Sequence, residues 1–141
     1  MTSYLIDTNV ISETARRKPS AGVVRWLSGL STLLIPSVGL YEIASGIQRL
    51  PSSDKRVFLE SWLAELLASS CEVVPFDGDA ALACAALEAD ARHRRRTIEQ
   101  RDLMILATAK SRGLGVATRN VAHYQGSGVP RYNPFDDVHL L

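Results

Sequence analysis

Three acidic residues of this sequence lie among apolar residues, where a carboxylate is unusual. Asp7 ends the apolar run Tyr4–Ile6, and Glu42 and Asp102 each interrupt an apolar context. A buried carboxylate is costly unless it is paired or coordinates a cation, and converging carboxylates raise one another's pKa. A divalent cation relieves that repulsion, and oxygen ligands without His or Cys favour Mg²⁺ or Mn²⁺ over Zn²⁺. The pattern therefore predicts a site that activates water and neutralises phosphodiester charge.

Each of these acids also has a simpler explanation. Asp7, Thr8 and Asn9 form a sequence that suits the capping of a helix N-terminus. A single acid within a helix, such as Glu42, is usually solvated, and an early helical acid, such as Asp102, complements the helix dipole. The metal hypothesis rests on the combination, because all three acids follow predicted strands.

Short apolar runs bounded by turn residues predict the strands that must position these acids. The predicted strands cover 3–7, 33–36, 71–76 and 115–118, and a last short edge strand is expected within 129–135 because of its two prolines. Helical patterns fill the intervals at 8–15, from 20, at 37–50, from 52 or 53, at 77–96, and from 97 to 113 or 115. Thr8 is an expected N-cap, and Thr97 forms a capping box with Gln100.

The alternation of strands and helices predicts an α/β fold with a mainly parallel sheet covered on both faces. In such sheets, ligands bind beyond the carboxyl ends of the strands. Asp7 follows the first strand, and Glu42 and Asp102 lie in the second turn of their helices. Thr118 and Asn120 accompany the end of the fourth strand. Four strand-to-helix regions therefore deliver polar or acidic groups to one edge of the sheet.

The composition is that of an ordinary globular domain. The chain has 141 residues, 46% of them hydrophobic and 22% charged, which fits one domain with its own core. A formal net charge of +1 does not by itself indicate a nucleic-acid partner. The sequence shows no signal peptide or membrane span, and Cys71 and Cys84 lack the spacing of a zinc site. We therefore expect a cytoplasmic protein without a membrane partner and with free thiols.

Four stretches of the chain, in order, resemble the PIN-domain proteins, and the nearest type is the VapC toxin of bacterial toxin–antitoxin pairs. They are YLIDTNVISE (4–13), LYEIASGIQRL (40–50), IEQRDLMILATAKSRGLGVATRN (98–120) and YNPF (132–135). The motif around Asp7 and the block from Asp102 to Asn120 are the most specific. The resemblance implies a single PIN domain over 1–141, with three α/β/α layers and a mainly parallel sheet of four to five strands.

The resemblance also implies a Mg²⁺-dependent endoribonuclease in which Mn²⁺ is a possible substitute. The acidic metal ligands of the family fall on Asp7, Glu42 and Asp102, and metal-activated water would hydrolyse the RNA phosphodiester. Thr118 matches the hydroxyl residue that steadies this cluster. The fourth acidic position of the family falls on Asn120, which brings no charge and puts a second tightly held metal ion in doubt.

Neighbouring polar and basic residues have supporting roles in this hypothesis. Thr8 and Asn9 are expected to fix the carboxylates together with the hydroxyl at 118, and Glu13 and Glu99 are weaker acidic candidates. The basic candidates for phosphate or RNA contact are Arg101 and Arg119, beside the key acids, and Arg94 and Arg95, in the basic run at 92–96. That run also suits a solvated helix end with a favourable dipole interaction. His93, His123 and His139 lack ligand spacing and are interpreted as surface or tail histidines.

Two partners besides RNA follow from the resemblance. A family member is expected to form a homodimer and to be inhibited by a cognate antitoxin that covers the acidic groove. Apolar surface on the helices that begin near Ser37 and Ser53 is a reasonable docking place.

Other functions are also considered. An aspartyl-phosphate phosphatase needs a second Asp two residues after the first, where this chain has Asn9. A nucleotide-binding loop is excluded because neither glycine-rich phosphate motif occurs. A catalytically weak or inactive module that binds RNA or protein remains an alternative, which Asn120 supports and the three retained acids oppose.

Overall fold

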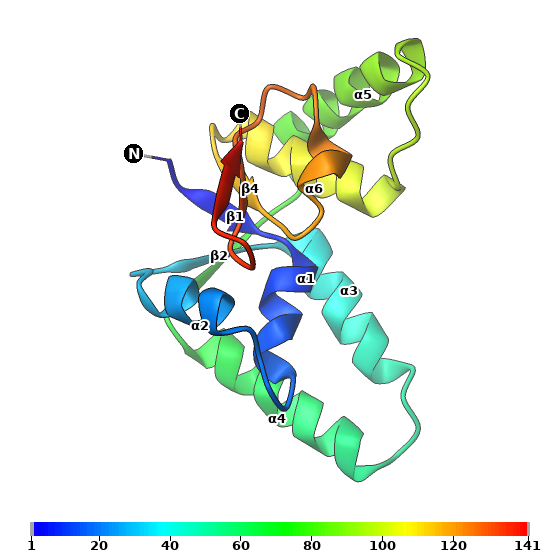
Figure 1. Cartoon of the computed structure of the whole chain (residues 1–141). Helices are drawn as coiled ribbons and strands as arrows, with labels where there is room; N and C mark the ends of the chain where they lie inside the picture. Colours follow the sequence, from blue (N-terminus) through cyan, green and yellow to red (C-terminus); the bar gives the residue numbers. More distant parts are fainter. Residues whose placement is uncertain (1, 141) are drawn as a thin grey trace.

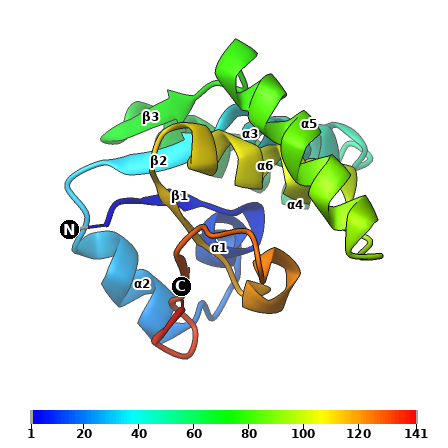
Figure 2. The ribbon, with the colours of Figure 1, turned by 90° about the horizontal axis from the view of Figure 1, so that it is seen from above.

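The computed structural model describes residues 2–140, which form a central sheet with helices on both faces (Figures 1 and 2). The sheet has six strands in the order β3-β2-β1-β4-β5-β6. The strands are β1 (Tyr4–Ile6), β2 (Leu33–Pro36), β3 (Cys71–Val74), β4 (Gly115–Ala117), β5 (Arg131–Asn133) and β6 (Val138–Leu140). The first five strands are parallel, and β6 pairs with β5 in antiparallel fashion. This confirms the α/β, mainly parallel, three-layer prediction.

The helices connect these strands and cover the sheet. They are α1 (Thr8–Ile11), η1 (Ser12–Ala15), α2 (Ala21–Ser28), α3 (Ser37–Gln48), α4 (Asp54–Ala68), α5 (Gly78–His93), α6 (Gln100–Ser111) and η2 (Val121–Tyr124). Figure 1 shows α5 and α6 on one side of the sheet and α1, α2 and α4 on the other. None of the described helices is both long and apolar enough to cross a lipid bilayer.

The direction in which strands are added to the sheet reverses at β1, next to the site. From β1 the chain crosses to β2 and β3 on one side, whereas β4 and β5 add on the other side. Adjacent strands β1 and β4 pair in register, with Leu5 opposite Val116. Their carboxyl ends therefore open onto a topological switch point, where open α/β sheets bind their ligands.

The core has two halves, one on each face of the sheet. Leu5 packs into a cluster with residues of α5 and α6, whereas its neighbour Ile6 packs with residues of α1, α2 and α3 on the opposite face. This follows from the alternation of side chains along a strand. Both residues are fully buried, so β1 is covered on both faces. Cys71 and Cys84 are free thiols, as predicted.

Several predicted boundaries are wrong. Asp7 and not Thr8 caps α1, since the Asp7 side chain accepts a hydrogen bond from the Thr8 N–H. Helix α6 begins at Gln100 with Glu99 as its N-cap, so Thr97 forms no capping box. Because of this later start, Asp102 lies in the first turn of α6 and not in the second.

The C-terminal part of the sheet also differs from the prediction. Strand β5 is not an edge strand, because it lies between β4 and the unpredicted β6. Pro130 and Pro134 stand just outside β5, where they disturb no ladder hydrogen bond. Helix α5 ends at His93, earlier than predicted, and Arg95 has a positive φ of 55° that terminates the helical path.

Candidate functional site

Asp7 stands at the carboxyl end of β1 and is only 4% exposed. Its backbone N–H continues the sheet by donating to the Ala117 carbonyl at 2.9 Å. Its Oδ1 accepts the Thr8 N–H at 2.7 Å, which caps α1. The same carboxylate therefore ends a strand, begins a helix and faces the switch point of the sheet.

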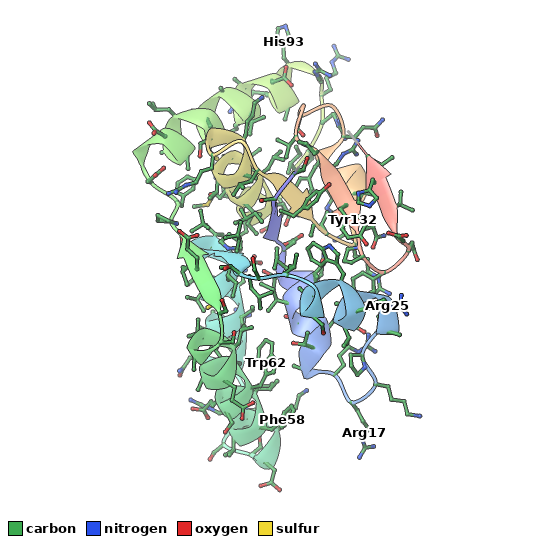
Figure 3. The ribbon with its side chains drawn as sticks, turned by 90° about the vertical axis from the view of Figure 1, so that its left-hand side faces the viewer. Arg17, Arg25, Phe58, Trp62, His93 and Tyr132 are labelled. Atoms are coloured by element: carbon green, nitrogen blue, oxygen red, sulfur yellow. The ribbon has the colours of Figure 1, made fainter. Side chains whose placement is uncertain are left out.

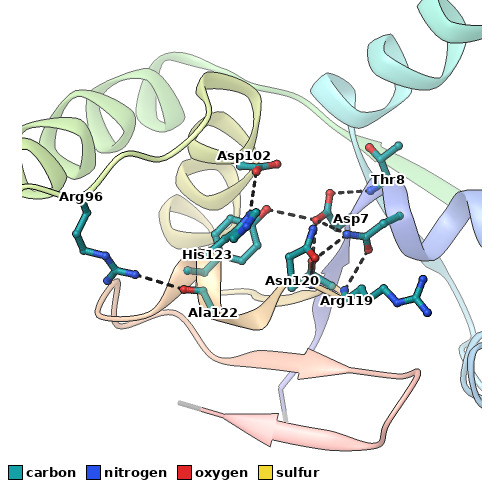
Figure 4. A network of polar contacts seen from close by, with 11 residues as sticks. Asp7, Thr8, Arg96, Asp102, Arg119, Asn120, Ala122 and His123 are labelled. Carbon is teal, nitrogen blue, oxygen red and sulfur yellow. Dashed lines mark hydrogen bonds and ion pairs between the residues drawn. The ribbon is translucent and has the colours of Figure 1, made fainter.

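The other oxygen of Asp7 is crowded by donors. Oδ2 accepts the Thr118 hydroxyl at 2.8 Å and the Tyr124 hydroxyl at 3.3 Å, and the Asn9 amide lies at 3.4 Å (Figure 4). Oδ1 has the Thr8 N–H as its hydrogen-bond donor. Because a carboxylate oxygen has two lone pairs, Oδ1 is the atom of Asp7 with the more open acceptor capacity.

Thr118 and Asn9 link the ends of β4 and β1. The Asn9 amide donates to the Thr118 hydroxyl at 3.3 Å, and the Asn9 carbonyl oxygen accepts the Arg119 N–H at 3.1 Å. The Asn120 N–H also donates to the Thr118 hydroxyl, at 3.0 Å. Because the buried Thr118 hydroxyl accepts hydrogen bonds from Asn9 and Asn120, its own proton is available for the hydrogen bond that it donates to Asp7.

Glu42 projects from α3 toward the same region. Its Oε1 accepts the Thr8 hydroxyl at 3.2 Å, and its Oε2 lies 3.8 Å from Nη1 of Arg101. Partial burial raises the pKa of Glu42, and the charges of Asp7 and Asp102 raise it further. Thr8 therefore contacts two of the three acids, through its N–H and through its hydroxyl.

Asp102 comes from the first turn of α6 and lies 3.4 Å from Nδ1 of His123. Burial is the main cause of its raised pKa, and the nearby Glu99 charge adds to it, whereas His123 and Tyr124 oppose the shift. Burial likewise raises the pKa of Asp7, with the Asp102 charge adding to the effect. The three acids are therefore close enough to perturb one another electrostatically.

Two residues of η2 lie against the acids although the sequence pattern does not single them out. Tyr124 is buried with its hydroxyl against Asp7, and its own pKa is raised by burial and then by the charges of Asp7 and Asp102. His123, interpreted above as a surface or tail residue, contacts Asp102 with a side chain that is half exposed. The sequence signal available for both was their position just after Thr118 and Asn120, which the strand end delivers to the site.

The remaining predicted residues have more varied surroundings. Arg119 places its guanidinium 4.2 Å from the centroid of the Phe135 ring, and Asn120 is exposed beside Thr118. Arg94 pairs with Asp90 of its own helix at 3.2 Å, and Arg95 is exposed at the end of α5.

Arg96, from the same basic run, holds η2. Its guanidinium donates to the carbonyls of Ala122 and Gln125. Glu13 is buried and accepts the Ser20 N–H at 2.7 Å, which is a structural contact. Arg17 and His93 lie at opposite ends of the molecule (Figure 3).

The donor set suits a hard divalent cation, but its present arrangement is loose. Within residues 2–140, no group of three or more His, Cys, Asp or Glu side chains is clustered tightly enough to hold a metal ion. The carboxylates nevertheless raise one another's pKa, and their oxygens are the ligands that Mg²⁺ and Mn²⁺ prefer. A cation would relieve this repulsion through small side-chain movements of Glu42 and Asp102, which are less buried than Asp7.

The chain is similar to known proteins over nearly its whole length. A PIN domain family model matches residues 4–126. The VapC ribonuclease Y4jK of Sinorhizobium fredii is 32% identical, with 94% of this chain and 97% of that protein covered. Plasmid stability protein StbB of Pseudomonas syringae pv. tomato is 34% identical over 94% of this chain and 98% of that protein. The crystal structure of FitAcB from Neisseria gonorrhoeae superimposes with a TM-score of 0.83 at 32% identity, covering 94% of this chain and 98% of that one.

Proposed function

The chain belongs to the PIN-domain family, and on that premise we propose that it is a divalent-metal-dependent endoribonuclease acting as the toxin of a toxin–antitoxin pair. The observation that carries this proposal is the buried Asp7 carboxylate, fixed at the switch point of the sheet and electrostatically coupled to Glu42 and Asp102. Its proposed substrate, RNA, would place its action in the cytoplasm.

Asp7, Glu42 and Asp102 are the proposed metal ligands. A bound Mg²⁺, or Mn²⁺ as a substitute, would supply positive charge to the phosphate and make the attacking water more acidic. Asp7 would bind through Oδ1, because Oδ2 already accepts the hydroxyls of Thr118 and Tyr124. Glu42 and Asp102 would share the cation or orient the water.

The surrounding residues would hold this geometry and the substrate. Thr8, Asn9 and Thr118 fix the carboxylates by the hydrogen bonds described above, which is the usual role of groups around metal ligands. Asn120 stands at the end of β4 without a charge and would contribute at most an amide oxygen. Arg101, 3.8 Å from Glu42, is the best placed cation for a phosphate near the scissile bond, and Arg119 is the second.

The proposed protein partner is an antitoxin. A groove of about 440 Å³ lies along α1, α3 and α4 beside the acids. Its lining is mainly apolar, with Ile43, Leu59 and Trp62, and also carries Glu42 and the cations Arg16 and Lys55. An apolar segment of a partner would fit this lining, which supports the predicted docking place. We further propose that residues 1–141 act as one domain and form a homodimer.

A catalytically weak or inactive binding module is the second candidate. The loose arrangement of acids in residues 2–140 and the amide at Asn120 favour it. Cleavage of a labelled mixed RNA pool separates the two, with Mg²⁺, with Mn²⁺ and with EDTA. The nuclease predicts cutting that needs the metal and disappears in Asp7→Asn. Metal-independent binding without cutting, by a folded protein freed of antitoxin, would favour the module.

A further inference from the structure

A second hollow lies between the beginnings of α3 and α6. It has a volume of about 700 Å³, and its lining includes Val38, Tyr41, Glu99, Gln100, Arg101 and Met104. Tyr41 immediately precedes Glu42, and Arg101 immediately precedes Asp102. The hollow therefore includes the sequence neighbours of two proposed metal ligands, so a group bound there would lie near the reacting phosphate.

Tyr41 is the most unusual residue of this hollow. A tyrosine ring is normally at least half buried in a core, yet Tyr41 is 58% exposed on α3. The Arg101 guanidinium carbon lies 5.4 Å from the centroid of its ring, in cation–π contact. Arg101 supports the ring on one side, so the exposed remainder of the ring presents a flat and apolar platform.

The charges around the hollow determine which part of an RNA fits there. Glu99 and Arg101 both line it, so their opposite charges offset each other and the hollow gives a phosphate no net attraction. A neutral planar group needs no such attraction. Val38 and Met104 supply apolar surface beneath it, while Glu99 and Gln100 supply acceptors and donors for its edge. These are the features with which proteins hold an unstacked RNA base.

We propose that this hollow binds a nucleobase next to the scissile phosphate, with the base stacked on Tyr41 and its edge read by Glu99 and Gln100. The inference rests on the proposed nuclease function and extends it to the substrate's sequence. Arg101 joins the two regions, because its guanidinium lies between the Tyr41 ring and the Glu42 carboxylate. The hollow would thus select the RNA sequence that is cut.

Binding without metal tests the inference independently of catalysis. The probe is a short ribo-oligonucleotide containing 2-aminopurine, whose fluorescence falls on stacking, titrated with protein in EDTA so that no cutting occurs. Loss of one base–aromatic stack weakens binding by roughly 5- to 100-fold. Tyr41→Ala is expected to raise Kd by that factor, whereas Tyr41→Phe, which keeps the ring, leaves it within about 2-fold. The matched control is Phe58→Ala, at another exposed aromatic residue, on α4.

The outcomes separate this inference from the proposed function. Equal Kd for wild type and Tyr41→Ala, with the fold intact by circular dichroism, overturns the base site whether or not the protein cuts RNA. If the wild type cuts in the presence of Mg²⁺, Tyr41→Ala and Glu99→Gln should both change the sequences at the cut sites. Weaker self-association of Tyr41→Ala without a change in Kd would instead assign the hollow to contacts between copies of the chain, and overturn the inference.

Discussion

The buried Asp7 carboxylate accepts hydrogen bonds at both of its oxygens. Three hydrogen-bond donors surround Oδ2 and one reaches Oδ1, yet burial still outweighs them and leaves the pKa of the carboxyl raised. The pKa values of Glu42 and Asp102 are raised as well. In the metal-free protein, all three ionised groups therefore oppose folding, and a bound cation would reverse that effect.

These shifts predict how stability depends on pH. An acid whose pKa is higher in the folded state holds its proton there longer than in the unfolded chain, so the free energy of unfolding falls as the pH rises from about 4 through the raised values. We expect the melting temperature in EDTA to decrease over that range and to decrease less steeply in Asp7→Asn. Thermal melts at a series of pH values test this, and parallel curves for the two proteins would contradict it.

Tyr124 should act on the site by positioning Asp7. Tyr124→Phe removes the hydroxyl that contacts Oδ2 while keeping the buried ring. Because loss of a hydrogen-bond partner of a metal ligand typically weakens metal binding by about 10- to 100-fold, the variant should need more Mg²⁺ for half-maximal cleavage. Its maximal rate at saturating Mg²⁺ should stay near that of wild type. Metal titration of both proteins gives the answer, and an unchanged Mg²⁺ requirement would assign Tyr124 to the core alone.

The sequence predicts the three acids and three of their hydrogen-bond partners, Thr8, Asn9 and Thr118, but it does not single out Tyr124 or His123. Asp7, Glu42 and Asp102 each carry a local signal, an acid among apolar residues after a strand. Tyr124 and His123 carry no such signal, since an aromatic residue and a lone His are common in any helical turn. Their role depends on how η2 turns back over the end of β1, which is a long-range property.

Among the elements, η2 depends on contacts from outside itself. It is a single 3-10 turn, too short to be stable alone, and it carries both His123 and Tyr124. Arg96 holds it through the carbonyls of Ala122 and Gln125, and Arg131 holds it through the Val121 carbonyl at 2.7 Å. The basic run at 92–96 thus has a structural role that its charge pattern did not indicate.

Removal of Arg96 should loosen η2 without unfolding the domain. Arg96→Ala is expected to increase hydrogen exchange of the backbone amides at 121–125 and to reduce cleavage by about 10-fold or more, because a misplaced supporting group weakens both metal binding and geometry. Arg92→Ala is the matched control, since Arg92 is exposed and pairs with Glu88 within α5. Equal exchange and activity in the two variants would show that Arg96 does not hold η2.

The elements themselves were predicted well, but their ends were not. Thr97 with Gln100 has the sequence of a capping box, yet α6 begins later because Glu99 adopts the extended backbone of the N-cap position. Both prolines near β5 suggested an edge strand, and they fall outside the paired residues. Strands β5 and β6 have only three residues each, and strands this short show almost no alternating pattern in the sequence. Their antiparallel pairing was therefore not predicted.

At the scale of the whole molecule, one sheet joins the two halves of the core, so both should unfold together. Leu5→Ala and Ile6→Ala each remove buried side-chain volume on opposite faces of β1, and each should lower the free energy of unfolding by about 2–5 kcal/mol. We expect a single transition of unchanged steepness in denaturant for both variants. A separate early transition in either variant would show that the two halves are independent units, against the proposed single domain.

The hydrogen bond from Thr118 to Asp7 joins residues 111 positions apart, and this has a consequence for the timing of synthesis. A ribosome that adds about 5–20 residues per second needs roughly 5–20 s to proceed from the first partner to the second. During that interval, β1 cannot pair with β4, and the Asp7 carboxylate lacks the hydrogen bond from the Thr118 hydroxyl. A nascent chain, or one cut short by a premature stop codon before Thr118, would lack the assembled site and leave the RNA around it intact.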